Sequence, residues 1–202
     1  MRKNVLTAFT IGFALLYGAA ALAAPPPART RGTIEGMSAD TLTLASRSGQ
    51  TVTFKITPDT KFASVTQAQI GDIQPDSYVG VTAAPQPDGK LRAMEVHVFA
   101  PSMRGVGDGH YPWDLGNDST MTNGAVGALQ GTNGRTLEVK YKGGDKEITV
   151  PEDTPIVAVA PADASIAKPG AHAMVLAPKD AAGGTPAAVF VLVGENGITP
   201  PM

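Results

Sequence analysis

The 202-residue chain contains no cysteine, few aromatic residues and one long apolar run. The lack of cysteine excludes disulfide bonds, thiolate metal sites and cysteine nucleophiles together. Aromatic residues make up 5% of the chain, against 23 glycines and 17 prolines, and apolar residues rarely recur at helical spacing. This composition predicts an all-β protein whose short strands are separated by turns.

The long apolar run lies at the N-terminus. Arg2 and Lys3 precede the uncharged residues 5–17, and the small-residue pattern ALA follows at residues 21–23. A basic start, a short apolar core and an A-x-A site are the parts of a cleavable signal peptide. We therefore interpret residues 1–24 as a signal for export to the periplasm or the extracellular space. The run is short for a membrane anchor of roughly 20 residues, so we expect no membrane span after cleavage.

The charge balance is mildly acidic, with 16 basic and 18 acidic residues in the whole chain. Loss of the signal peptide would leave a net charge of about −4, whereas nucleic-acid binding depends on neutralising many phosphates with lysine and arginine. We therefore expect no nucleic-acid partner.

The exported part of the chain is predicted to be an internal duplication. Five pairs of segments correspond in the same order, among them 32–36 (GTIEG) with 127–131 (GALQG), 54–60 (FKITPDT) with 148–154 (ITVPEDT), and 89–98 (GKLRAMEVHV) with 184–193 (GTPAAVFVLV). The nearly constant spacing between partners indicates two copies of one structural unit.

Each copy is predicted to form five short strands. Met94, Val96 and Val98 alternate with polar residues, which is typical of a half-buried strand and predicts that Glu95 and His97 form a solvated pair on its outer face. A longer connection separates the third strand from the fourth, and we expect it to hold one short helical turn near Ile70 or its counterpart near Ile166.

Closure is the usual way for so small a sheet to avoid exposed edges. The predicted fold class is therefore all-β, with two tandem five-stranded OB-like small barrels joined by a docked irregular connector. The predicted boundaries are residues 25–100 for the first barrel, 101–123 for the connector, 124–194 for the second barrel and 195–202 for a disordered tail.

Three segments of the first copy carry a family resemblance: GTIEGMSADTLTL, GQTVTFKITPDTKF and IGDIQPDSYVGVTAAPQPDGKLRAMEVHVF. Residues 32–99 resemble a family of bacterial exported domains of unknown function with an OB-like fold. The second copy matches more loosely and lacks the Gly-Asp pair. The shared motifs are structural, so the resemblance implies a fold and no catalytic residue. Fold alone does not fix function.

The connector carries the most distinctive side chains, in the stretch GDGHYPWDLGNDSTMTNG at residues 107–124. Its Tyr111, Trp113 and Leu115 could pack between the barrels as a docked connector. Alternatively, Tyr111 and Trp113, with His110, could form an exposed platform that binds a ligand such as a sugar or peptide. A third interpretation is a divalent-metal site, and its candidate ligands are Asp108, His110, Asp114 and Asp118. Their spacing matches no strong metal motif.

The favoured function is an exported, non-catalytic tandem β-barrel that serves as a binding or interaction module. It would use no cofactor and would bind an unknown periplasmic protein or a small ligand. The first alternative is a periplasmic metal-binding accessory protein with a divalent metal ion at the connector. The second is a weak hydrolase at the groove between barrels, with the hydroxyl of Ser102, Ser119 or Thr120 as nucleophile and His110 as base. No common hydrolase or phosphate-binding motif occurs in the chain, so we do not expect an enzyme.

Overall fold

The computed structural model describes residues 28–130, 135–179 and 184–201, and the predicted signal peptide lies outside them. The described protein is all-β, as predicted, with 3-10 turns and no α-helix. The strands are β1 (Ala28–Met37), β2 (Thr41–Ser46), β3 (Thr51–Lys55), β4 (Lys61–Gln67), β5 (Tyr78–Pro85), β6 (Leu91–Phe99), β7 (Gly109–Pro112), β8 (Thr120–Gln130), β9 (Thr136–Tyr141), β10 (Gly144–Thr149), β11 (Ile156–Ala162), β12 (His172–Ala177) and β13 (Phe190–Gly194). Within the described ranges, no helix has the length and apolarity needed to cross a membrane.

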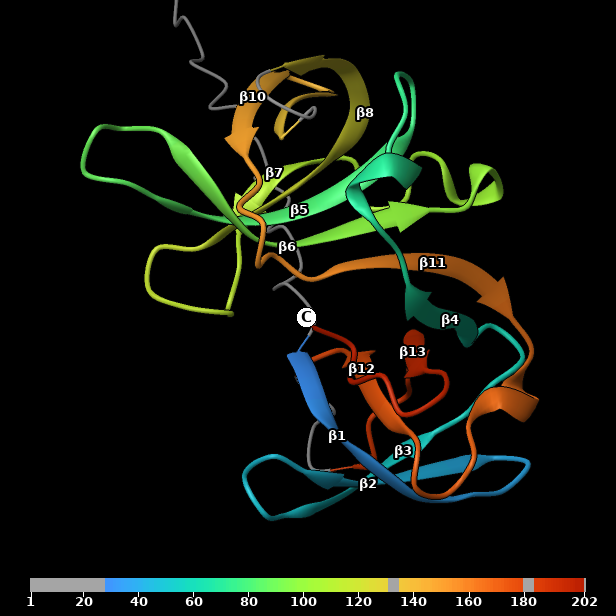
Figure 1. Ribbon diagram of the computed structural model, residues 1–202. Coiled ribbons are helices and arrows are strands. Elements are labelled where there is room, and N and C mark those ends of the chain that lie inside the picture. The colour runs from blue at the N-terminus through green and yellow to red at the C-terminus, as the bar shows by residue number, and fades with distance from the viewer. Residues whose placement is uncertain (1–27, 131–134, 180–183, 202) are drawn as a thin grey trace, which may run out of the picture.

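Five strands close into a barrel, which occupies the upper part of Figure 1. Antiparallel pairing joins β6 to β5, β5 to β8, β8 to β9 and β9 to β10. A short parallel contact between β10 and β6, with Ile148 opposite Leu91, completes the circle. We call these strands the barrel unit. Its interior is filled by side chains such as Val81, Val96 and Leu137, which are fully buried.

The corresponding strands of the duplication form a second unit in the lower part of Figure 1. Here β13 pairs with β12, β12 with β1, β1 with β2 and β2 with β3. A single parallel bridge joins Lys55 of β3 to Ala187, which lies three residues before β13. A separate apolar cluster that includes Leu42, Phe54 and Val191 fills this unit.

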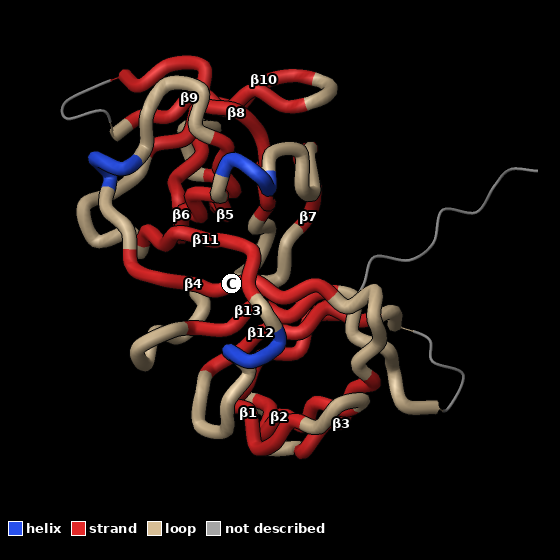
Figure 2. The backbone as a smooth tube through the Cα atoms, turned by 90° about the vertical axis from the view of Figure 1, so that its right-hand side faces the viewer, coloured by secondary structure: helices blue, strands red, loops and turns tan. Residues whose placement is uncertain are grey.

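Strands β4 and β11 join the two units. They pair with each other in antiparallel fashion, with Val65 opposite Val159, and each also pairs in parallel with the final strand of one copy, β13 or β6. Figure 2 shows them crossing the middle of the molecule. Both strands lie where the sequence predicts only a long connection between the third and fourth strands of each copy. The predicted helical turns that follow them are confirmed as η1 (Ile70–Asp72) and η4 (Ala164–Ile166).

Both units contain strands from both halves of the chain. The barrel unit combines β5 and β6 from the first half with β8, β9 and β10 from the second, and the second unit combines β1, β2 and β3 with β12 and β13. This arrangement differs from the prediction of one self-contained barrel in each half, and only the barrel unit closes by strand pairing. Local hairpins can be predicted from the sequence. The strands that pair with the outer strands of each hairpin lie far away in the chain, and because the two copies have similar sequences, the pattern does not distinguish between them.

The strand register also corrects the alignment of the two copies. Residues Thr33 and Ala125 face equivalent residues of β2 and β9, and each of β1 and β8 has a bulge shortly after that point. Gly32 is therefore equivalent to Gly124 and not to Gly127. A Cβ atom on either glycine would lie about 2 Å from a backbone carbonyl oxygen of the facing strand, at Ala45 or at Lys140.

Two predicted irregular segments are more ordered than expected. In the connector, β7 pairs with β8, and β8 itself begins at Thr120 and pairs there with β5. The predicted disordered tail packs onto the molecule: the backbone nitrogen of Glu195 donates to the carbonyl oxygen of Val65, and Ile198 contacts the central apolar cluster. As predicted from its prolines, the described part of the tail, residues 195–201, contains no strand.

Candidate functional site

A cavity of about 490 Å³ lies between the barrel unit and the second unit, beneath the connector. The lining residues come from the second unit (Arg29, Met174, Leu176, Phe190, Leu192), from the barrel unit (His97, Phe99, Met121, Asn123) and from the connector (Val106, Gly107, Tyr111, Pro112, Trp113). Its size is within the range of small-molecule sites, and most of its lining is apolar with a few polar groups, which is typical of such sites.

The strand pairs on the two sides of the cavity, β12 with β13 and β5 with β6, are equivalent in the duplication. On the second unit, β12 and β13 place Met174 opposite Leu192 and Leu176 opposite Phe190. On the barrel unit, β5 and β6 place Gly80 opposite His97 and Thr82 opposite Glu95 at the equivalent positions. One copy therefore has apolar side chains where the other has a glycine and three polar side chains.

These polar residues are buried. Glu95 and His97 are 0% and 1% exposed, which corrects the prediction of a solvated pair. The outer face of β6 is covered because the second unit and the connector pack against it, so the strand is buried on both sides. Thr82 donates a hydrogen bond of 2.7 Å to Oε1 of Glu95, and the same oxygen lies 3.4 Å from Nε2 of His97.

Burial determines the ionisation of this pair. Removal from water disfavours the charged form of each group, so it raises the pKa of Glu95 to about 7 and lowers the pKa of His97 to about 3. The hydrogen bond from Thr82 acts in the opposite direction on Glu95, but it is the smaller effect. At mildly acidic pH the pair therefore consists of a protonated carboxyl group beside a neutral imidazole.

Unpartnered polar atoms concentrate around the cavity. Among the described residues, the buried side-chain atoms without a hydrogen-bond partner are Nε of Arg29, Oε2 of Glu95, Nε2 of His97, Nε1 of Trp113 and Oδ1 of Asn123. Four of these five residues line the cavity, and Glu95 lies beside His97. Each such atom costs about 1–3 kcal/mol of stability, so their concentration at one place points to a site that a ligand completes.

Residues 106–114, which we call the strap, cover the cavity. Tyr111, Pro112 and Trp113 line the cavity. The side chain of His110, the neighbour of Tyr111 on β7, lies instead on the barrel, where its ring stacks on that of Tyr141 at 5.9 Å. Two of the three predicted ligand-binding residues therefore meet at the cavity and the third does not. Arg29 lies over the Trp113 ring, with its guanidinium carbon 3.6 Å from the ring centroid.

Hydrogen bonds hold the strap at both ends. At its start, Asp108 accepts hydrogen bonds from the Tyr78 hydroxyl and from the backbone nitrogen of Lys142. At its end, Arg31 donates to both carboxylate oxygens of Asp114, at 3.1 and 2.8 Å. This bidentate bond lowers the pKa of Asp114, partly opposed by burial. The strap thus connects the barrel unit to β1 of the second unit.

The candidate metal ligands do not meet. Asp108 and Asp114 are occupied by the contacts at the two ends of the strap, and Asp118 sits in a turn with a left-handed φ of 57°. Within the described ranges, no group of three or more histidine and acidic side chains could hold a metal ion.

A hydroxyl group does lie beside His110, but it is not one that the sequence suggested. Nδ1 of His110 is 2.9 Å from the hydroxyl of Thr122, which is fully buried, whereas the hydroxyl of Ser119 donates to backbone carbonyls of the connector. A buried hydroxyl has no access to a substrate. This pair therefore fixes β7 on β8 and offers no catalytic nucleophile of the kind that an adjacent base activates.

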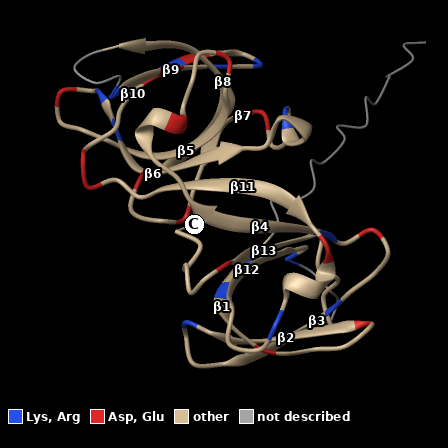
Figure 3. Cartoon of the chain, turned by 45° about the vertical axis from the view of Figure 1, so that its right-hand side comes forward, with Lys and Arg blue, Asp and Glu red and all other residues tan. Residues whose placement is uncertain are grey.

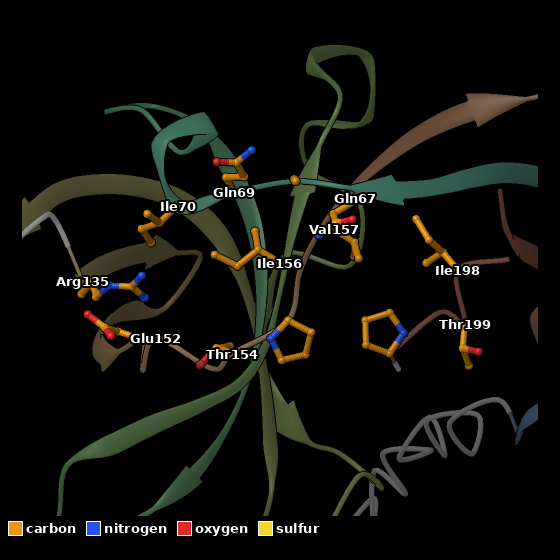
Figure 4. A pocket seen from close by; sticks show the side chains of 13 residues that line it. Gln67, Gln69, Ile70, Arg135, Glu152, Thr154, Ile156, Val157, Ile198 and Thr199 are labelled. Carbon is orange, nitrogen blue, oxygen red and sulfur yellow. The ribbon is translucent and has the colours of Figure 1, made fainter. Parts of the chain in front are cut away.

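A second groove, of about 420 Å³, lies beside the start of β11, at Ile156 and Val157. Figure 4 shows Arg135 and Glu152 on one side of it and Ile198 and Thr199 on the other, with Ile156 between them. The guanidinium group of Arg135 donates hydrogen bonds to the backbone carbonyl oxygens of residues 150 and 151. None of the unpartnered buried atoms identified in the described chain belongs to this groove, so the cavity beneath the strap is the better candidate site.

Comparison with known proteins identifies a domain of unknown function over most of the first copy. A domain of unknown function, DUF5666, is found at residues 31–97. The match spans β1 to β6, whose strands belong to both units of the fold. No curated protein and no solved structure matches the chain.

The sequence pattern marks the connector but does not mark β6 as a strand beside the cavity. A signal was present in the duplication: β13 reads FVLVG, a continuous apolar run typical of a strand buried on both faces. The equivalent strand β6 has Glu95 and His97 in that pattern. β6 thus has polar residues at two positions that are apolar in the equivalent strand β13. The fold alone does not require this difference, so it indicates a functional role.

Proposed function

We propose that this protein is an exported, non-catalytic binding protein that holds a small, mainly apolar molecule in the cavity beneath the strap. The observation that carries the proposal is the combination of an apolar cavity with four lining residues whose buried polar atoms have no partner. An apolar ligand body would pack against Leu176, Phe190 and Trp113, and a polar group on the ligand would complete one or more of the free donors and acceptors.

Binding without catalysis fits the chemistry of the walls. His97 has no orienting acid other than Glu95, which favours its own protonated form, and the one hydroxyl in contact with Glu95 belongs to the fully buried Thr82. Such groups can donate or accept hydrogen bonds to a bound molecule. The N-terminal pattern of residues 1–24 supports export.

The proposal can be tested with N-phenyl-1-naphthylamine, an uncharged apolar dye that becomes fluorescent on leaving water. We expect saturable binding to the purified protein at one site. Leu176 is half-buried on the cavity wall, so Leu176→Phe would narrow the cavity from that wall and weaken dye binding by about threefold or more. Val189→Phe is the matched control. Val189 is exposed and does not line the cavity, so this variant should leave binding unchanged.

Absence of saturable dye binding would overturn the proposed function. So would equal binding by the protein, the Leu176→Phe variant and the control, because the dye would then occupy another surface. Circular dichroism and thermal unfolding should first establish that both variants are folded.

A further inference from the structure

The ligand class follows from a group of arginines at the edge of the same cavity. An open groove of about 400 Å³ is lined by Arg29, Arg31 and Arg47, together with the hydroxyl residues Ser46 and Ser48. Arg29 lines both this groove and the apolar cavity beneath the strap. Figure 3 marks basic residues on β1 in blue. The two spaces therefore meet at one side chain, which has an apolar environment on one side and positive charge on the other.

The positive charge in this groove exceeds the negative charge beside it. Arg31 forms a bidentate pair with Asp114, and Arg29 lies 3.8 Å from the same carboxylate, so two guanidinium groups share one acid. Arg47 adds a third cation at an exposed position. Glu95 also interacts with Arg31 and Arg47, but its burial favours the neutral carboxyl group. The excess stands out in a chain whose overall net charge is −2.

Arg29 itself is incompletely satisfied. Its side chain is 13% exposed, its Nε has no hydrogen-bond partner, and burial lowers its pKa. A buried cation is costly unless an anion and hydrogen-bond acceptors accompany it. Its contact with Trp113 provides a cation–π interaction but no acceptor. Asp114 supplies one negative charge, which Arg29 shares with Arg31, so an anionic group near Arg29 would add a second charge and an acceptor for its Nε.

From this juxtaposition we infer that the natural ligand is an amphipathic anion, whose acidic head group lies at Arg29 and Arg47 and whose apolar chain enters the cavity beneath the strap. The inference rests on the proposed function and adds the class of ligand. Carboxylate and phosphate head groups share the chemistry that a guanidinium recognises, because both offer two or more oxygens to its planar set of donors. The cavity requires that the remainder of the ligand be apolar.

The chain offers a built-in reporter for this ligand. Trp113 is the only tryptophan of the protein, and it lines the cavity. Titrations with decanoate and with uncharged decan-1-ol, below their micellar concentrations, can therefore be followed by Trp113 emission and by displacement of the naphthylamine dye. We expect both compounds to bind and to displace the dye, and decanoate to bind about tenfold more tightly. Each methylene group added across a series of shorter acids should tighten binding by about fourfold until the cavity is full.

Arg47→Gln isolates the head group, because Arg47 lines the arginine groove but not the cavity. Arg47 is exposed, so we expect the variant to weaken decanoate binding by about threefold to fivefold and to leave decanol binding unchanged. Arg92→Gln removes a half-exposed arginine from β6 in the barrel unit and is the matched control. Raising the salt concentration should reduce the preference for decanoate in the same way.

The outcomes separate the two proposals. If decanol binds as tightly as decanoate, or if Arg92→Gln weakens decanoate as much as Arg47→Gln, the anionic ligand class is overturned while dye binding still supports the proposed function. If decanoate binds without displacing the dye, the single amphipathic site is overturned. If the dye itself does not bind, the proposed function has failed first.

Decyl phosphate distinguishes the two possible head groups. Tighter binding than decanoate supports the inference and assigns a phosphate head group, whereas weaker binding supports it with a carboxylate head group.

Discussion

Replacing Glu95 by glutamine should change the stability of the protein in a pH-dependent way. The carboxyl group is fully buried, and its pKa of about 7 in the folded protein exceeds the usual value of 4.5 that applies when the chain is unfolded. The folded state therefore binds this proton more tightly. The resulting stabilisation is fully present below pH 4.5, declines as the pH rises, and is lost above about pH 7. Since each pKa unit corresponds to 1.36 kcal/mol, the loss amounts to about 3 kcal/mol.

Glutamine keeps the shape of the side chain and an oxygen that accepts the hydrogen bond from Thr82, but it cannot ionise. The free energy of unfolding, measured by urea denaturation at pH 5 and at pH 8.5, should therefore favour the Glu95→Gln variant over the unmodified protein by about 2.5 kcal/mol more at the higher pH. Glu147→Gln, at an exposed position of β10, controls for the loss of one acidic residue. An equal stability difference at both pH values would refute the reasoning, because it would mean that Glu95 is already ionised at pH 5, beside a protonated His97.

Two further predictions concern the fold. Gly32→Ala would place a Cβ 2.1 Å from the carbonyl oxygen of Ala45, so we expect a loss of stability of about 3 kcal/mol or more in thermal or urea unfolding, whereas Gly36→Ala on the same strand meets no atom within 4 Å and should cost less than about 1 kcal/mol. Equal losses would contradict the close approach of β1 to β2. Residues 25–104 and 105–202, produced separately, should not form stable monomers, because each half lacks the partner strands of both units, but a mixture should regain the Trp113 emission and β-sheet circular dichroism of the whole chain. A stable, monomeric first half would show that the exchange of strands is not required.

The sequence by itself determined the class of the fold and its local parts. Alternating side chains and glycine-containing turns predicted most strands, the duplication predicted two similar units, and the short turns after β4 and β11 followed from the same pattern. These features depend on neighbouring residues. The unusual composition of the connector also identified Tyr111 and Trp113, which line the cavity. The same reasoning placed His110 with them, although its ring stacks on that of Tyr141 on the barrel.

Only the tertiary structure decided which strands complete each unit and which strands are buried on both faces. β4 and β11 bring two similar halves together as a central antiparallel pair, and this arrangement lets β5 and β6 join strands of the second half. Because the second unit then covers the outer face of β6, Glu95 and His97 leave the solvent although their strand has the pattern of a half-buried one. Alternation along a strand records which residues share a face. Whether water or another layer of protein lies against that face depends on contacts between residues far apart in the chain.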